Sequence, residues 1–195
     1  MRKRLLGATL LPLVATATMA ATLAPEINIT SGSRVWAAGT STVRAWRCET
    51  ARVEGSANGA GSTAIADLDA VRNAEISLTV ASLDCRNETM NGHMRRALKS
   101  DEAAAIRFRA TSVSVTPSGD GQAAVRMSGP LSIAGQDKTV TIDATAVREA
   151  NGALRVRGSK QINMTEWGVR PPSLMMGTMK VAPGVTIGFD VLLTS

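Results

Sequence analysis

Alternation of apolar and polar residues with a period of two is the feature that most constrains the fold of this chain. Short segments in which every second residue is apolar recur between residues 76 and 191. Such a segment forms a strand with one side against a core and the other in water. The pattern occurs at residues 76–80, 106–108, 125–127, 131–133, 140–142, 154–156 and 185–191.

The residues between these segments are typical of tight turns. Asn151-Gly152, Pro183-Gly184 and the stretch 117–121 supply the positive φ angles that short hairpins need. Strands at this spacing predict one all-β domain, an antiparallel sandwich or barrel of about eight strands. Gly129-Pro130 interrupts one strand, and we expect a bulge or a sheet edge there because proline donates no ladder hydrogen bond.

One segment, residues 87–99, has the period of a helix instead. Met90, Met94 and Leu98 share one face, Asn87 is a suitable N-cap, and Lys99 lies near the C-terminus of the segment. This predicts a single amphipathic helix with a methionine-rich apolar face. The helix either packs against the barrel core or acts as an adaptable lid over an apolar cavity, since methionine repacks easily.

The N-terminal residues predict export. Residues 1–20 combine Arg2, Lys3 and Arg4 with a long uncharged apolar run that ends in small residues, which is the pattern of a signal peptide. An uncleaved anchor is the alternative, but threonines, a glycine and a proline dilute the run. We expect residues 21–32 to be a short extended leader and residues 33–195 to be the folded domain, located in the periplasm or secreted. No stable membrane span is expected after cleavage.

Cleavage also changes the charge of the chain. The formal net charge of +6 falls by three, to +3. This is ordinary surface charge, and with no Tyr, two Phe and three Trp the chain also lacks a stacking platform, so we expect no nucleic-acid partner.

Cys48 and Cys85 are the two cysteines of the chain. An oxidising compartment favours a disulfide between them, and the alternative is two separate buried thiols. No C-x-x-C spacing is present, so the sequence contains neither a thioredoxin-type redox motif nor a haem-attachment motif.

The sequence offers few groups for catalysis. It contains no nucleophile-elbow, phosphate-loop or dinucleotide motif, and its single histidine, His93, lies in the helical segment. We therefore expect a protein that is not an enzyme and has no metal and no cofactor. The methionine run at residues 174–179 is compatible with Cu(I), but we interpret it as apolar lining.

Several motifs together resemble one known family. Residues 128–142 (SGPLSIAGQDKTVTI), 165–172 (TEWGVRPP), 179–187 (MKVAPGVTI) and 90–94 (MNGHM) are similar to the YceI-like family in their order and spacing. The resemblance spans roughly residues 33–194. It implies a lipocalin-like antiparallel barrel with one helix, exported to the periplasm, that binds polyisoprenoids or other long apolar ligands such as quinones or fatty-acid derivatives. The chain departs from the family in having little aromatic lining.

The inward side chains predict a hollow barrel. Most are of medium size, and eight strands enclose either a filled core or one small ligand. We expect a carrier for a long apolar ligand, with a non-catalytic interaction module as the alternative, and the oligomeric state is left open between a monomer and a homodimer. Trp167 is interpreted either as a cap on the barrel mouth or as a packing anchor. The expected apolar lining is Ile76, Leu78, Val80, Met90, Met94, Ile106, Phe108, Met127, Leu131, Ile133, Val140, Ile142, Trp167 and Leu174.

Overall fold

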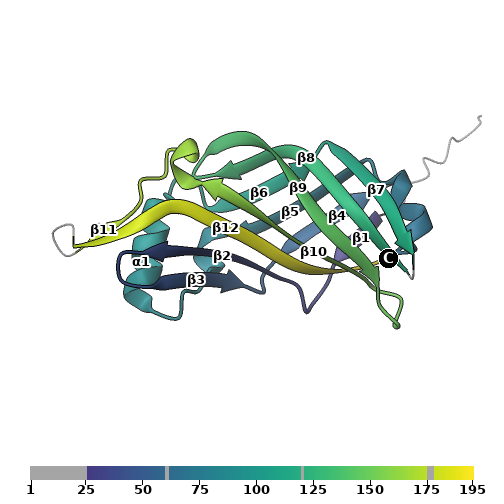
Figure 1. Cartoon of the computed structure of the whole chain (residues 1–195), viewed down its shortest axis with the longest axis horizontal. Coiled ribbons are helices and arrows are strands. Elements are labelled where there is room, and N and C mark those ends of the chain that lie inside the picture. Colours follow the sequence, from purple (N-terminus) through teal and green to yellow (C-terminus); the bar gives the residue numbers. More distant parts are fainter. Residues whose placement is uncertain (1–25, 60–61, 120, 175–177) are drawn as a thin grey trace, which may run out of the picture.

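The part of the chain that the structure describes forms a closed antiparallel β-barrel with one α-helix at one end (Figure 1). The computed structural model describes residues 26–59, 62–119, 121–174 and 178–195, so the predicted signal peptide at 1–20 lies outside the described residues. The predicted all-β fold class is confirmed. Eight strands close the barrel in the order β1 (Glu26–Ile29), β4 (Glu54–Asn58), β5 (Asn73–Thr79), β6 (Ala105–Ala110), β8 (Gln122–Ile133), β9 (Gln136–Arg148), β10 (Leu154–Asn163) and β12 (Met179–Thr194).

The barrel closes where the last strand pairs with the first. β12 pairs with β10 along most of its length, and its end pairs with β1, where Ile29 lies opposite Leu193. The earlier part of β12 pairs instead with β2 (Arg34–Ser41), which continues into β3 (Ala45–Thr50). The β2–β3 hairpin therefore extends the wall at one end of the barrel, beyond the point where the cylinder is closed (Figure 1).

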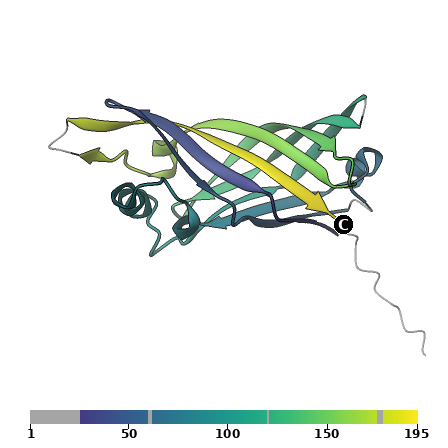
Figure 2. The same ribbon diagram turned by 90° about the horizontal axis from the view of Figure 1, so that it is seen from below.

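The helix α1 (Glu88–Ala97) lies at the same end as the β2–β3 hairpin, and the two views agree on this (Figures 1 and 2). It begins where expected, because the side chain of Asn87 accepts a hydrogen bond of 2.9 Å from the backbone N–H of Met90. The predicted disulfide is present and joins Cys48 of β3 to Cys85, three residues before α1. A β-bridge between Glu49 and Asp84 fixes the same two segments.

The opposite end of the barrel is closed by a short helix. The 3-10 helix η1 (Ile65–Ala70) places Leu68 over the strands, and Leu68 and the following Val71 are buried against Ile27 and Leu154. The barrel therefore has a sealed end at η1 and a second end covered by α1 and the β2–β3 hairpin. The other short elements are β7 (Ser112–Gly119), η2 (Val80–Ser82), η3 (Met164–Trp167) and β11 (Ser173–Leu174).

The sequence predicts that Gly129-Pro130 interrupts its strand, but β8 runs through both residues, and the bulge lies opposite them on the neighbouring strand. Phe108 of β6 pairs with Leu131, whereas Ser112 of β7 pairs with Ser128, so three residues on one strand face two on β8. The extra residue belongs to the β6–β7 strand, and β8 itself pairs with β9 without interruption. Gly129 permits the close approach, because a Cβ atom there would lie 1.9 Å from the carbonyl oxygen of Arg109.

Residues 26–29, which the sequence predicts to belong to an extended leader, are extended and form β1. They are part of the barrel, because β1 pairs with both β4 and β12. Ile27 is 1% exposed, which explains why so short a strand is held firmly. Every helix in the described part of the chain is too short or too polar to cross a bilayer.

Candidate ligand-binding cavity

Two adjoining cavities occupy the interior of the barrel. The inner cavity, toward η1, encloses about 150 Å³, and the outer cavity, beneath α1, encloses about 410 Å³. Val35, Leu78, Ile106 and Ile187 line both, so these four side chains mark the junction between them. The outer cavity alone falls within the range of about 300–1,000 Å³ that is usual for small-molecule sites.

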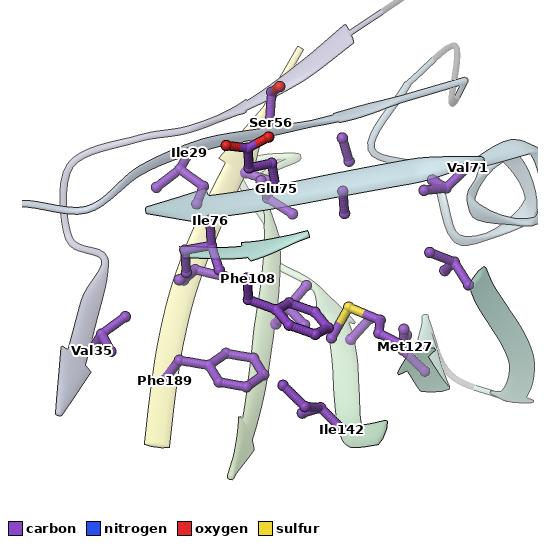
Figure 3. A pocket seen from close by; sticks show the side chains of 18 of the residues that line it. Ile29, Val35, Ser56, Val71, Glu75, Ile76, Phe108, Met127, Ile142 and Phe189 are labelled. Carbon is purple, nitrogen blue, oxygen red and sulfur yellow. The ribbon is translucent and has the colours of Figure 1, made fainter. Parts of the chain in front are cut away.

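The inner cavity is lined almost entirely by apolar side chains. Figure 3 shows Ile76, Phe108, Met127, Ile142 and Phe189 gathered around it, contributed by β5, β6, β8, β9 and β12. These side chains come from the inward rows of five strands, as the alternation of residue types predicts.

Glu75, which also borders the inner cavity, is not part of its apolar lining. Figure 3 shows its carboxylate near Ser56, on the side of β5 away from Ile76. The carboxylate pairs with Arg107 at 3.1 Å and with Arg109 at 3.5 Å. Its charge is therefore balanced on the outer face of the sheet.

Two aromatic rings approach a glycine on the neighbouring strand closely. A Cβ atom on Gly158 would lie 2.6 Å from Cζ of Phe189, its partner across β10 and β12. A Cβ atom on Gly39 would lie 2.6 Å from Cζ2 of Trp46, its partner across β2 and β3. The tip of the Phe189 ring therefore lies where a side chain at position 158 would be, at the inner cavity, and the Trp46 ring lies where a side chain at position 39 would be, at the outer cavity.

The outer cavity reaches the protein surface under α1. Met90, His93 and Met94 of the helix form one side of its lining. Its lining also includes the exposed residues Arg44 and Thr89, which places its rim at the surface. The arrangement therefore has an apolar interior and a polar rim.

The segment before α1 is fixed by one buried polar side chain. Asn91 is 6% exposed; its Oδ1 accepts from the backbone N–H of Cys85 at 2.8 Å, and its Nδ2 donates to Oδ1 of Asp84 at 3.0 Å. The hydrogen bond from Asn91, followed by one from the backbone N–H of Arg86, lowers the pKa of the Asp84 carboxyl. Asp84 therefore remains ionised at neutral pH and orders the start of the helix.

The sequence matches the YceI-like domain family over residues 30–193. The chain belongs to the YceI-like family. Among curated proteins, none matches the chain.

Solved structures share the fold of this YceI-like protein. Burkholderia cenocepacia BcnA has a TM-score of 0.67 at 18% identity, covering 84% of this chain and 96% of the other. A polyisoprenoid-binding domain from Saccharophagus degradans, implicated in plant cell wall breakdown, has a TM-score of 0.66 at 11% identity, covering 89% and 99%. The Campylobacter jejuni YCEI protein has a TM-score of 0.50 at 14% identity, covering 64% and 73%.

Most of the lining residues predicted for the YceI-like barrel border the cavities. Leu78 and Ile106 lie at the junction, and Met90, Met94 and Ile133 line the outer cavity. The inner cavity contains the others, which are Ile76, Phe108, Met127, Leu131 and Ile142.

Three predicted lining residues are buried but border neither cavity. Val80 is fully buried in η2, and Val140 packs into the same apolar cluster as Trp167. Trp167 is 2% exposed and its Nε1–H donates a 2.8 Å hydrogen bond to the carbonyl of Leu131. Of the two interpretations of Trp167, the packing anchor is therefore the one that the geometry supports. The side chain of Leu174 lies outside the described residues.

Sequence reasoning missed several lining residues of the YceI-like cavity. Ile187 and Phe189 belong to the alternating segment 185–191, which predicts their strand and could have placed them in the lining. Val35 stands beside Trp36 and two alanines, where no clear alternation marks the inward face. Lys160 was missed for a different reason, because a charged residue is not expected to face an apolar core.

Proposed function

We propose that this protein is an exported, non-catalytic carrier that holds a long apolar ligand, of polyisoprenoid, quinone or fatty-acyl type, inside its barrel. The observation that carries this proposal is the pair of adjoining cavities, which have apolar linings and reach the surface beneath α1. A cavity of this kind suits a ligand that must be shielded from water while it crosses an aqueous compartment.

The energetics support binding. Each methylene group buried on transfer from water contributes about 0.8 kcal/mol. Roughly fifteen buried carbons therefore contribute on the order of 12 kcal/mol of binding free energy. After association and ordering costs of several kcal/mol are subtracted, the remainder corresponds to micromolar or tighter affinity. The name of the Saccharophagus degradans domain, polyisoprenoid-binding, agrees with a ligand of this class.

Two features support an exported location. Residues 1–20 have the pattern of a signal peptide. The Cys48–Cys85 disulfide forms readily in an oxidising compartment such as the periplasm.

The proposal is tested by extracting the mature protein, purified from its own host, into organic solvent and identifying the extract by mass spectrometry. We expect a long-chain apolar molecule in stoichiometric amount. An empty protein that takes up no polyprenol, quinone or fatty acid contradicts the carrier function and favours an interaction module.

A matched pair of variants shows whether the ligand occupies the barrel. Leu78→Trp fills the junction of the two cavities, whereas Thr79→Trp adds the same ring on the exposed side of the same strand. We expect Leu78→Trp, if folded by circular dichroism, to contain little ligand and Thr79→Trp to contain as much as the wild type. Equal ligand content in both variants would place the ligand elsewhere.

A further inference from the structure

The interior of the barrel is closed at one end and open at the other, and we call its two adjoining cavities together the tunnel. At the inner end the lining includes Leu68 and Val71, which are both buried and form the floor of the tunnel. At the outer end the lining includes Arg44 and Thr89, which are exposed. Figure 3 shows Val71 on the far side of the inner cavity from Val35, a residue of the junction.

The η1 segment is fixed at both of its ends. Before η1, Thr63 is 5% exposed, and its Oγ1 donates a hydrogen bond of 2.6 Å to the carbonyl of Gly152, between β9 and β10. After η1, the backbone N–H of Arg72 donates to the carbonyl of Asn58 in β4 at 2.9 Å. In the strand order, β4 and the β9–β10 connection lie on opposite sides of the barrel. The segment therefore spans the barrel end with an attachment on each side, which fixes the floor in place.

Strand β12 runs along the whole tunnel. Val181 and Val185 line the outer cavity, and Ile187 lines both cavities. Val191 and Leu193 line the inner cavity. At about 3.3 Å per residue and a tilt of about 40°, the segment 181–193 covers roughly 30 Å along the barrel axis. A single extended chain of that length reaches from the rim to the floor.

The inner cavity is suited to the end of a chain. Its volume of about 150 Å³ is below the range of about 300–1,000 Å³ that is usual for a whole small-molecule ligand, so it receives only part of one. Ile27, Ala146 and Leu154 line this cavity and pack in one apolar cluster with the floor. A polar group buried there without a hydrogen-bond partner is strongly disfavoured. The end of the ligand that reaches the floor is therefore apolar.

We propose that the floor sets an upper limit to the length of the ligand, which is a single linear chain bound tail first, with its apolar end against Leu68 and Val71 and its polar end at the rim. This rests on the proposed carrier function and deepens it by assigning the orientation of the ligand and the residues that limit its tail. Each methylene group added to a chain shorter than the tunnel is buried and strengthens binding. A methylene group added beyond the limit stays in water at the rim and adds nothing.

The test is a series of saturated fatty acids with even numbers of carbon atoms, from dodecanoate to hexacosanoate. Their affinities are measured by displacement of a fluorescent fatty acid from delipidated wild-type protein. We expect affinity to rise about tenfold for each two carbons and then to level off, because the tail has reached the floor. A second probe, 16-hydroxyhexadecanoate, carries a hydroxyl group at the end of the tail and should bind at least about tenfold more weakly than hexadecanoate.

Two variants enlarge the inner end of the tunnel, Val71→Ala by a little and Leu68→Ala by more. In both, if folded by circular dichroism, the chain length at which affinity levels off should increase, by about two carbons in Leu68→Ala. Val140→Ala is the matched control for Val71→Ala, because it makes the same change at a buried position that borders neither cavity. It should keep the wild-type limit.

Wild-type affinity that rises without a limit up to the longest acid overturns the role of the floor. A limit that Leu68→Ala leaves unchanged, or that is equal in Val71→Ala and Val140→Ala, overturns it as well. Equal affinity for hexadecanoate and its hydroxylated form overturns the tail-first orientation. Failure of every acid to bind the wild type overturns the carrier function itself. The two wild-type comparisons need no variant to fold.

Discussion

Gly158 and Gly39 lie opposite aromatic residues on neighbouring strands, Phe189 at the inner cavity and Trp46 at the outer cavity. In most cores an aromatic ring fills space. Here Phe189 and Trp46 lie over the glycines, where a Cβ atom would come within 2.6 Å of either ring. The absence of a side chain at Gly158 therefore leaves room for the Phe189 ring beside the inner cavity, and the absence of one at Gly39 leaves room for the Trp46 ring beside the outer cavity.

We predict that Gly158→Ala reduces ligand binding by pushing the Phe189 ring toward the centre of the inner cavity. Gly184→Ala is the control, because a Cβ atom at this exposed position on the neighbouring strand β12 would meet nothing within 4 Å. A Cβ atom at Gly158 would also lie 2.8 Å from the carbonyl oxygen of Asp143, so Gly158→Ala should lose stability, on the order of 1–3 kcal/mol, from overpacking, whereas the control should not. Only Gly158→Ala should lose affinity for the apolar ligand, measured on folded protein, and equal affinities in the two variants would contradict this account.

The Asp84 carboxylate is predicted to make the attachment of α1 sensitive to acid. Its pKa is lowered in the folded protein, chiefly by the hydrogen bond from Asn91, so its contribution to stability is complete above about pH 4, the ordinary pKa of aspartate. The contribution is lost as the pH falls through the lowered pKa. Amide hydrogen exchange of residues 85–98 should therefore accelerate below about pH 4, relative to the barrel strands.

Asp84→Asn removes this titration. In that variant, amide hydrogen exchange of residues 85–98 should depend on pH no more than exchange of the barrel strands does. Asp101→Asn, at an exposed position after the helix, is the matched control and should keep the acid response. If the acid response survives in Asp84→Asn, another group is responsible.

At the scale of elements, α1 is attached to the barrel mainly through the segment that precedes it. The Cys48–Cys85 disulfide and the Glu49–Asp84 bridge join that segment to β3, and Arg86 pairs with Glu49 at 3.1 Å. The C-terminal end of the helix packs through Leu98 against the apolar cluster of Leu131 and Ile133. The helix is therefore anchored covalently at its N-terminal end and by packing alone at its C-terminal end.

We predict that removing the disulfide loosens α1 and speeds release of the ligand. The bond closes a loop between residues 37 positions apart, so the double variant Cys48→Ser, Cys85→Ser should lose about 3–4 kcal/mol of unfolding free energy. Its ligand dissociation rate should rise, measured by transfer to acceptor vesicles. A reducing agent should have the same effect on the wild type and none on the variant. Unchanged dissociation after reduction would show that the ligand does not leave beneath α1.

At the scale of the whole molecule, alternation was enough to predict an antiparallel all-β domain, because a period of two fixes which residues share a face, and the resemblance to the YceI-like family favoured a barrel over a sandwich. It could not show where on that face each residue lies. Val80 and Val140 share the inward pattern of Leu78 and Ile142, yet neither borders a cavity. β5 ends at Thr79, so Val80 lies in η2, and Val140 packs in the cluster that contains Trp167.

The features that shape the cavity depend on contacts between segments far apart in the sequence. The pairing of Gly158 with Phe189 and the position of Lys160 beside Ile187 follow from the register of β10 on β12. The sequence of either strand alone does not specify that register. The residues that keep the barrel hollow were therefore less predictable than the strands that form it.

We predict that the ligand stabilises the whole barrel, since its contacts come from strands all around the wall. At a free concentration one hundred times the dissociation constant, the gain is about 2.7 kcal/mol. For a chain of this size that raises the melting temperature by roughly 5–10 °C. Differential scanning calorimetry of delipidated and reloaded protein measures the shift, and Leu78→Trp, whose junction is filled, should show none.

The pairing of β12 has a consequence for the order in which the molecule can form. This strand, near the C-terminal end of the sequence, pairs with β10, with β1 and with β2, so it joins the earliest strands to the latest. Until residues 179–194 are available, β1 and β10 each keep one edge without a partner strand, and the barrel has no closed interior. The cylinder therefore cannot assemble progressively from its beginning as the chain is made. The polypeptide stays open until its final strand arrives, which is the state that the proposed export would require before folding.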